Sequence, residues 1–230
     1  MSDITIRVPD GEFSAYLARP ASERGPGVVV IQEIFGVNHV VRQVADTLAA
    51  AGFFALAPDL FWRLERGVQL TDKTDAEWQS AFGLLKRFDA DKGVADIQAT
   101  ITHLRGLPGV TGKVGAVGHC LGGRLAAMTA MRTDSDASVG YYGIMLDSLL
   151  GEAGNIKMPL MLHIAEEDEF APKPVQAKVK AGLEGNPLVT IHGYPGVDHA
   201  FARPGGKHYD KAAAELADGR TLSFFRQHLT

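Results

Sequence analysis

The sequence lacks the features that mark secreted, membrane-spanning or nucleic-acid-binding proteins. It has one cysteine in 230 residues, so no disulfide can form within the chain. It has no apolar run of membrane-spanning length, and its opening residues, MSDITIRVPDG, include acids where a secretory signal needs an apolar segment. Its net charge of −4 gives no electrostatic basis for binding nucleic acid or an anionic membrane. These absences predict a cytoplasmic protein with a reduced thiol.

Sequence patterns for cofactor binding are also missing. The eight histidines are dispersed, and neither they nor the cysteine show the spacing of metal ligands. The glycine-rich segment 118–123 lacks the lysine of a P-loop and the glycine spacing of a dinucleotide-binding loop. We therefore expect the protein to act on a small molecule without a metal or a cofactor.

What the sequence does contain is an alternation of short apolar runs and segments with helical spacing. The apolar runs predict strands at residues 4–8, 14–19, 27–32, 53–57, 113–117, 137–142, 159–165 and 188–194. Helical spacing predicts helices at residues 37–51, 75–88, 91–107, 121–131, 174–183 and 209–228. This alternation favours the α/β class, with a mostly parallel central sheet and helices on both faces. We expect one domain over residues 1–230, with residues 60–74 as an excursion that could form a small cap.

The single cysteine lies in a motif typical of a catalytic nucleophile. Residues 118–123 read Gly-His-Cys-Leu-Gly-Gly and lie between the predicted strand 113–117 and the predicted helix 121–131. A strand, a sharp turn and a helix form a nucleophile elbow, here with cysteine in the usual place of serine. The positive end of the helix dipole would favour the Cys120 thiolate. The alternative is a buried structural cysteine beside a glycine-rich helix start.

Candidate partners for this cysteine follow the last two predicted strands. A cysteine nucleophile needs a base and an acid that orients the base, and parallel strands bring such groups together at their carboxyl ends. Among the histidines, His199 follows the last strand, whereas His163 and His192 fall inside strands and are expected to pack. Residues 166–169, Glu-Glu-Asp-Glu, offer four candidate acids, with Asp147 as a weaker rival. The order nucleophile, acid, histidine is that of α/β-hydrolases.

The residue after the cysteine and an earlier loop are candidates for an oxyanion hole. Such a hole uses two backbone N–H groups. One belongs to the residue after the nucleophile, which here is Leu121. The other comes from an earlier strand–helix loop, which here is residues 32–38. Glu33 lies in that loop directly after a predicted buried strand, so we do not expect full exposure of its carboxylate. Near Cys120, it would hold the thiol proton or alter the reactivity of the thiol through its charge.

Taken together, these residues resemble the dienelactone hydrolase family, the carboxymethylenebutenolidases, which have the α/β-hydrolase fold. The resemblance spans nearly the whole chain. It is carried by Gln-Glu-Ile-Phe-Gly-Val-Asn at 32–38, Ala-Pro-Asp-Leu at 57–60, the segment 114–123, Tyr-Tyr-Gly at 141–143, Asp168, and His199 with Phe201 and Arg203.

The resemblance implies a set of site residues. By this resemblance, Cys120 is the nucleophile, His199 its base and Asp168 the acid that orients the base. Glu33 regulates the thiol, and Arg203 binds the substrate carboxylate. The backbone N–H groups of Ile34 and Leu121 form the oxyanion hole. By the same resemblance, substrate binding displaces the glutamate and so helps to generate the thiolate.

The sequence departs from the family pattern beside the nucleophile and in the substrate-binding helix. His119 stands where the family often has an aromatic residue, and Ala165 stands where glycine usually opens the segment of the acid. Family members that cleave dienelactone use an arginine and a nearby tyrosine to bind the substrate. The matching positions here are Trp78 and Phe82.

Without that arginine, a second carboxylate-binding cation would have to come from Lys86, Arg87 or residues 60–66. One charge-assisted hydrogen bond contributes about 1.5–3 kcal/mol, so its loss weakens binding roughly tenfold or more. Otherwise the more aromatic pocket suits a less charged lactone or ester.

The sequence therefore predicts a hydrolase of lactones or activated esters that forms an acyl-enzyme on Cys120 and acts as a monomer. The alternative is a non-catalytic ligand-binding or thiol redox-sensing protein on the same fold. The presence of Cys120, Asp168 and His199 together favours the hydrolase, because a binding protein has no need of all three.

Overall fold

The computed structural model describes residues 2–230, and at its centre is an eight-stranded sheet with the order β1-β2-β4-β3-β5-β6-β7-β8. β2 runs antiparallel to β1 and to β4, and the other neighbours are parallel. The strands are β1 Ser2–Val8, β2 Gly11–Ala18, β3 Gly25–Ile31, β4 Phe54–Pro58, β5 Val110–His119, β6 Ala137–Tyr141, β7 Leu160–Ala165 and β8 Val189–Tyr194.

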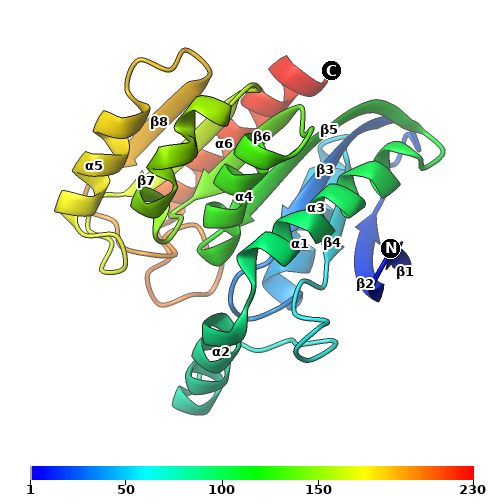
Figure 1. Ribbon diagram of the computed structural model, residues 1–230, viewed down its shortest axis with the longest axis horizontal. Helices are drawn as coiled ribbons and strands as arrows, with labels where there is room; N and C mark the ends of the chain where they lie inside the picture. Colours follow the sequence, from blue (N-terminus) through cyan, green and yellow to red (C-terminus); the bar gives the residue numbers. More distant parts are fainter. Residues whose placement is uncertain (1) are drawn as a thin grey trace.

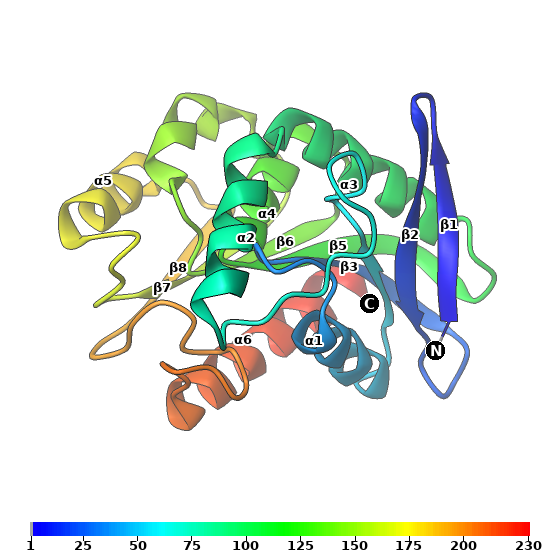
Figure 2. The same ribbon diagram turned by 90° about the horizontal axis from the view of Figure 1, so that it is seen from below.

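Helices cover both faces of this sheet (Figures 1 and 2). They are α1 His39–Ala50, α2 Asp75–Arg87, α3 Ala90–Arg105, α4 Leu121–Arg132, α5 Lys173–Leu183, α6 Lys211–Leu229 and the 3-10 helix η1 Leu146–Asn155. α1 and α6 lie on one face, and α3, α4 and α5 lie on the other. α2 projects away from the sheet at one end of the molecule. The predicted fold class, a mostly parallel sheet with helices on both faces, is confirmed.

Four of the inner strands are buried along their whole length because helices cover them from both sides. Every residue of β3, β4, β6 and β7 is buried. Parallel strands in this setting are continuous apolar runs, which is the pattern that identified them in the sequence. The outer strands β1 and β8 are more exposed.

Two helices begin later than the sequence pattern predicted, because a capping side chain precedes each of them. α1 begins at His39, after Asn38 accepts hydrogen bonds from the Val40 and Val41 N–H groups. α6 begins at Lys211, after Asp210 accepts one from the Ala213 N–H. Such caps satisfy backbone donors that the first turn leaves free. The helix η1 was not predicted.

The predicted excursion at residues 60–74 returns across the loop that follows β3. The Leu70 N–H donates to the Phe35 carbonyl at 2.9 Å, and Gln69 forms an isolated bridge with Gly36. The excursion is therefore joined to the 32–38 loop, at the edge where the parallel strands end.

Candidate active site

Cys120 lies at the sharp turn between β5 and α4, as the motif predicted. Its backbone has φ +56° and ψ −116°, a conformation that costs a non-glycine residue about 1–3 kcal/mol. The Cys120 N–H donates to the Tyr141 carbonyl at 3.1 Å and holds the turn. A Cβ on Gly118 would lie 2.1 Å from the Gly122 carbonyl oxygen, and a Cβ on Gly122 2.5 Å from that of Ile31. Both glycines are required because the strand and the helix approach so closely.

His199 and Asp168 form a buried pair at the ends of β8 and β7. His199 Nδ1 and Asp168 Oδ2 lie 2.9 Å apart, and both side chains are almost fully buried. The Phe170 N–H donates to the second carboxylate oxygen at 2.8 Å, which fixes the orientation of the carboxylate. With Nδ1 bonded to the acid, Nε2 is the nitrogen that faces away from the acid.

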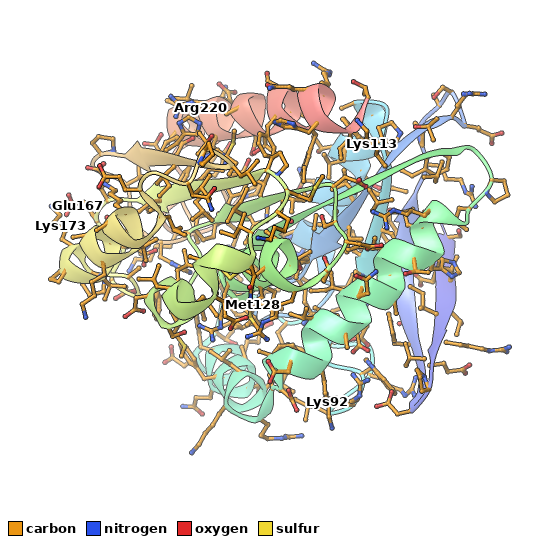
Figure 3. All side chains as sticks on the ribbon, turned by 45° about the horizontal axis from the view of Figure 1, so that its top comes forward. Lys92, Lys113, Met128, Glu167, Lys173 and Arg220 are labelled. Carbon is orange, nitrogen blue, oxygen red and sulfur yellow. The ribbon has the colours of Figure 1, made fainter. Side chains whose placement is uncertain are left out.

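Asp168 is the one candidate acid that lies beside His199 in the described structure. Of the four acids at 166–169, Asp168 alone is buried. Glu167 lies at the outer surface, where it pairs with Lys173 Nζ at 2.9 Å (Figure 3). Asp147 lies in the first turn of η1 and makes no hydrogen bond to His199 in the described structure.

His199 carries a strongly basic imidazole. Burial opposes its protonation, but the Cys120 side chain and the Asp168 carboxylate outweigh burial and raise the pKa of His199 to about 10. Its Nε2 has no hydrogen-bond partner among residues 2–230. The rings of Tyr142 and Phe170 flank the imidazole at centroid distances of 5.0 and 4.7 Å. A free Nε2 beside a thiol can take up the thiol proton.

Glu33 is bound to Arg203. Arg203 Nε and Nη2 donate to the two carboxylate oxygens, each at 2.9 Å, and both side chains are buried. Burial raises the pKa of Glu33, but the Arg203 charge and hydrogen bonds outweigh burial and hold the pKa below its usual range. The guanidinium also lies over the Phe35 ring, 5.1 Å from its centroid. Glu33 is therefore ionised and paired.

His119, beside the nucleophile, is stacked on Tyr141 with a centroid distance of 4.4 Å. Burial lowers its pKa to about 4; the nearby Arg203 charge acts in the same direction, and Glu33 opposes it. His119 is therefore neutral at pH 7 and serves as a planar packing residue. This explains how a histidine fits where the family often has an aromatic side chain.

Cys120 and His199 open into one small pocket. Its wall includes Ile34, Trp78, Phe82, Leu85, Ile144, Phe170 and Arg203. Trp78 and Phe82, both on α2, stack at a centroid distance of 5.5 Å. The free volume is about 30 Å³, roughly one water molecule. Phe82 is partly exposed, so this wall of the pocket lies at the protein surface.

Both proposed oxyanion donors lie near the nucleophile. Leu121 is the first residue of α4, directly after Cys120, and Ile34 lines the pocket. The Ile34 loop is tightly turned, with a bridge between Glu33 and Gly36.

The described lining residues of the pocket include Arg203 but no lysine and no second arginine. Lys86 and Arg87 lie in the last turn of α2 and do not line it. Arg63 is engaged elsewhere, by Asp10 and Asp96. A lysine or arginine that takes the place of the missing substrate-binding arginine is therefore not found among the described lining residues of the pocket.

Within residues 2–230, no group of three or more His, Cys, Asp or Glu side chains is arranged to hold a metal ion. Over the same residues, no helix combines the length and apolarity needed to cross a membrane.

Three residues at the site were missed by sequence reasoning. Tyr142 has φ +35°, and Phe170 follows the acidic run; both contact His199. Asp72 accepts a hydrogen bond from Arg203 Nη1 at 3.1 Å. The Tyr-Tyr-Gly segment at 141–143 was a sequence signal for Tyr142. Asp72 lies in an irregular segment, where the sequence pattern gives no signal.

Comparison with known proteins agrees with this geometry. A sequence model of the dienelactone hydrolase family matches residues 13–229. A provisionally named carboxymethylenebutenolidase of Azospirillum brasilense is 53% identical over 234 residues, covering 100% of both chains. The carboxymethylenebutenolidase of Pseudomonas putida is 38% identical, covering 96% of this chain and 94% of its own.

A solved structure is similar over the same length. It is a provisionally identified dienelactone hydrolase from Klebsiella pneumoniae, with a TM-score of 0.87 and 26% identity, covering 98% of each chain. The resemblance expected from the sequence is confirmed. The chain belongs to the dienelactone hydrolase family, a family of lactone and ester hydrolases with the α/β-hydrolase fold.

Proposed function

We propose that this hydrolase cleaves a dienelactone-like lactone or an activated ester, with Cys120 as nucleophile, His199 as its base and Asp168 as the acid that orients the base. The observation that carries the proposal is the buried His199–Asp168 contact of 2.9 Å, which leaves Nε2 free in the pocket that Cys120 also lines. This is the arrangement that an activated thiol requires.

Attack begins when the Cys120 thiol loses its proton to His199 Nε2. The start of α4 favours the thiolate through its backbone dipole. The thiolate sulfur forms a bond to the carbonyl carbon, and the carbonyl oxygen becomes an oxyanion. The N–H groups of Leu121 and Ile34 stabilise that oxyanion.

The ester C–O bond then breaks, and its electron pair leaves with the oxygen as an enolate or a phenolate. The leaving group needs little help from an acid, which suits a thiolate nucleophile. The Cys120 charge disappears in the thioester, and with it the main interaction that raises the His199 pKa. His199, which still carries the thiol proton, gives it to the released enolate or phenolate. As a neutral imidazole it then accepts a proton from the attacking water, and the thiolate is expelled as the carboxylic acid forms.

Glu33 and Arg203 link substrate binding to this chemistry. A polar substrate group that binds Arg203 competes with Glu33 for the same donors. The released carboxylate is then a second acceptor for the thiol proton beside His199, so an occupied site favours the thiolate.

Steady-state hydrolysis of dienelactone and of a neutral aryl ester, by the native chain and by Cys120→Ala, tests the proposal. We expect turnover of at least one substrate in the native chain and its loss in the variant. Turnover that survives in Cys120→Ala would refute the cysteine mechanism. A native chain inactive on both substrates would favour the ligand-binding or redox-sensing alternative.

A further inference from the structure

Asp72 is a second carboxylate on Arg203. It lies in the segment just before α2, and its side chain is only 10% exposed. Arg203 Nη1 donates to Asp72 Oδ2 at 3.1 Å, while Nε and Nη2 hold Glu33. All three nitrogens of the guanidinium are therefore engaged by carboxylates.

The position of Asp72 is fixed by its neighbours. Trp78 Nε1 donates to the Asp72 carbonyl at 3.2 Å, and Lys73 Nζ donates to the Gly205 carbonyl at 2.6 Å. On the other side, the Thr71 N–H and hydroxyl donate to Glu77 at 2.8 Å each. These bonds hold the start of α2 beside the loop that leads into α6 (Figure 2).

The cluster of Asp72, Glu33 and Arg203 carries one net negative charge. Burial raises the pKa of Asp72, but Arg203 outweighs burial and, with Lys73, keeps it below the usual range, so the carboxylate is ionised at pH 7. Lys73 lies 3.5 Å away but is largely exposed, so solvent screens its charge. A ligand carboxylate approaching Arg203 meets two carboxylates already in place.

We propose that Asp72 determines substrate specificity: it occupies Arg203 and selects against substrates with a carboxylate at that end, in favour of neutral lactones and esters. This proposal rests on the proposed function and names its substrate class. Asp72 does not touch the reacting atoms. It acts through Arg203 and is a positioning residue.

Two esters with the same leaving group test the proposal. They are para-nitrophenyl pentanoate, which is neutral, and the para-nitrophenyl monoester of glutarate, which ends in a carboxylate. In Asp72→Asn we expect kcat/KM for the glutarate ester to rise about tenfold, mainly through KM, because one nearby negative charge is lost. The readout is the ratio of the glutarate value to the pentanoate value, which should rise because the pentanoate ester has no carboxylate.

The matched control is Asp75→Asn. Asp75 lies three positions further on, in the first turn of α2, and forms no ion pair with the described residues. An equal rise in Asp75→Asn would overturn the proposal, because the effect would then be a general change of charge. An unchanged ratio between the two esters in Asp72→Asn would also overturn it.

Calorimetric titration with glutarate makes the same comparison without turnover. Glutarate should bind Asp72→Asn about tenfold more tightly than the native chain; equal affinities would overturn the proposal. Thermal unfolding of each variant checks that the fold is intact. Hydrolysis of the pentanoate ester by Cys120→Ala would refute the cysteine mechanism, whereas the glutarate titration reports on Asp72 independently.

Discussion

Arg203 binds Glu33 through two parallel hydrogen bonds of 2.9 Å, although 170 positions separate the two residues in the sequence. Both side chains are buried, so each charge depends on the other for its compensation. The pair joins the loop after β3 to the loop after β8 and brings a cation to the edge of the pocket. We therefore propose a structural role for the pair in addition to its role in substrate binding.

Arg203→Met should destabilise the fold by about 3–5 kcal/mol, because it leaves the Glu33 carboxylate buried and unpaired. The double variant Arg203→Met/Glu33→Gln should recover much of that loss, since Glu33 no longer carries a buried charge and Asp72 still has Lys73 as a partner. Urea unfolding at pH 7 measures both. If the single and double variants lost the same stability, the pair would not be compensating a buried charge.

Asp168→Asn should lower kcat by about 10²–10⁴-fold, because an amide does not hold His199 in the required tautomer or stabilise its charged form. Asp147→Asn, which changes the rival acid in η1, is the control and should leave kcat within about twofold of native. Equal losses in both variants would argue against Asp168 as the orienting acid.

His119→Phe should make stability less sensitive to acid. The pKa of His119 is lowered from 6.5 to about 4 in the folded protein, so between these values the unfolded chain binds a proton that the folded chain does not. Native stability therefore falls as the pH drops from 6.5 towards 4, by about 2 kcal/mol at pH 5 from this residue.

Urea unfolding at pH 7 and pH 5 tests this. The loss of stability between the two pH values should be about 2 kcal/mol smaller in His119→Phe than in the native chain. The pKa of His163 is also lowered by burial, so some acid sensitivity remains in the variant. An identical loss in both proteins would contradict a His119 that is neutral in the folded protein.

Trp78→Arg should improve binding of carboxylate-bearing substrates, because it adds a cation to a pocket where Arg203 provides the positive charge. The KM of dienelactone should fall roughly tenfold, the value of one charge-assisted hydrogen bond. The KM of a neutral aryl ester should not fall. Trp78→Phe controls for loss of the indole, and an equal gain in that variant would show that space, not charge, limits binding.

The alternation of strands and helices could be predicted from sequence because the parallel strands β3, β4, β6 and β7 are fully buried and appear as apolar runs. The position of Cys120 was equally clear, since Gly118 and Gly122 allow the close approach that the turn requires. These features are local, and local sequence is sufficient to show them.

The partners within the site could not be predicted in the same way. Asp168 differs from its acidic neighbours only in burial, which depends on how the ends of β7 and β8 pack together. The expected packing role of His163 is confirmed, but its hydrogen bonds to Tyr194 and Thr221 join residues distant in sequence. Asp72 lies in an irregular segment, and its contact with Arg203 depends on the path of the chain between β4 and α2.

The most direct test of the account is to look for the acyl-enzyme on Cys120. His199→Ala is mixed with a neutral aryl ester, the reaction is quenched in acid, and the mass of the intact chain is measured, with peptide mapping to locate any adduct. We predict one acyl group on Cys120, released slowly because water lacks its base, and none in Cys120→Ala/His199→Ala. An unmodified Cys120 during turnover by the native chain, or an acyl group on another residue, would contradict the account.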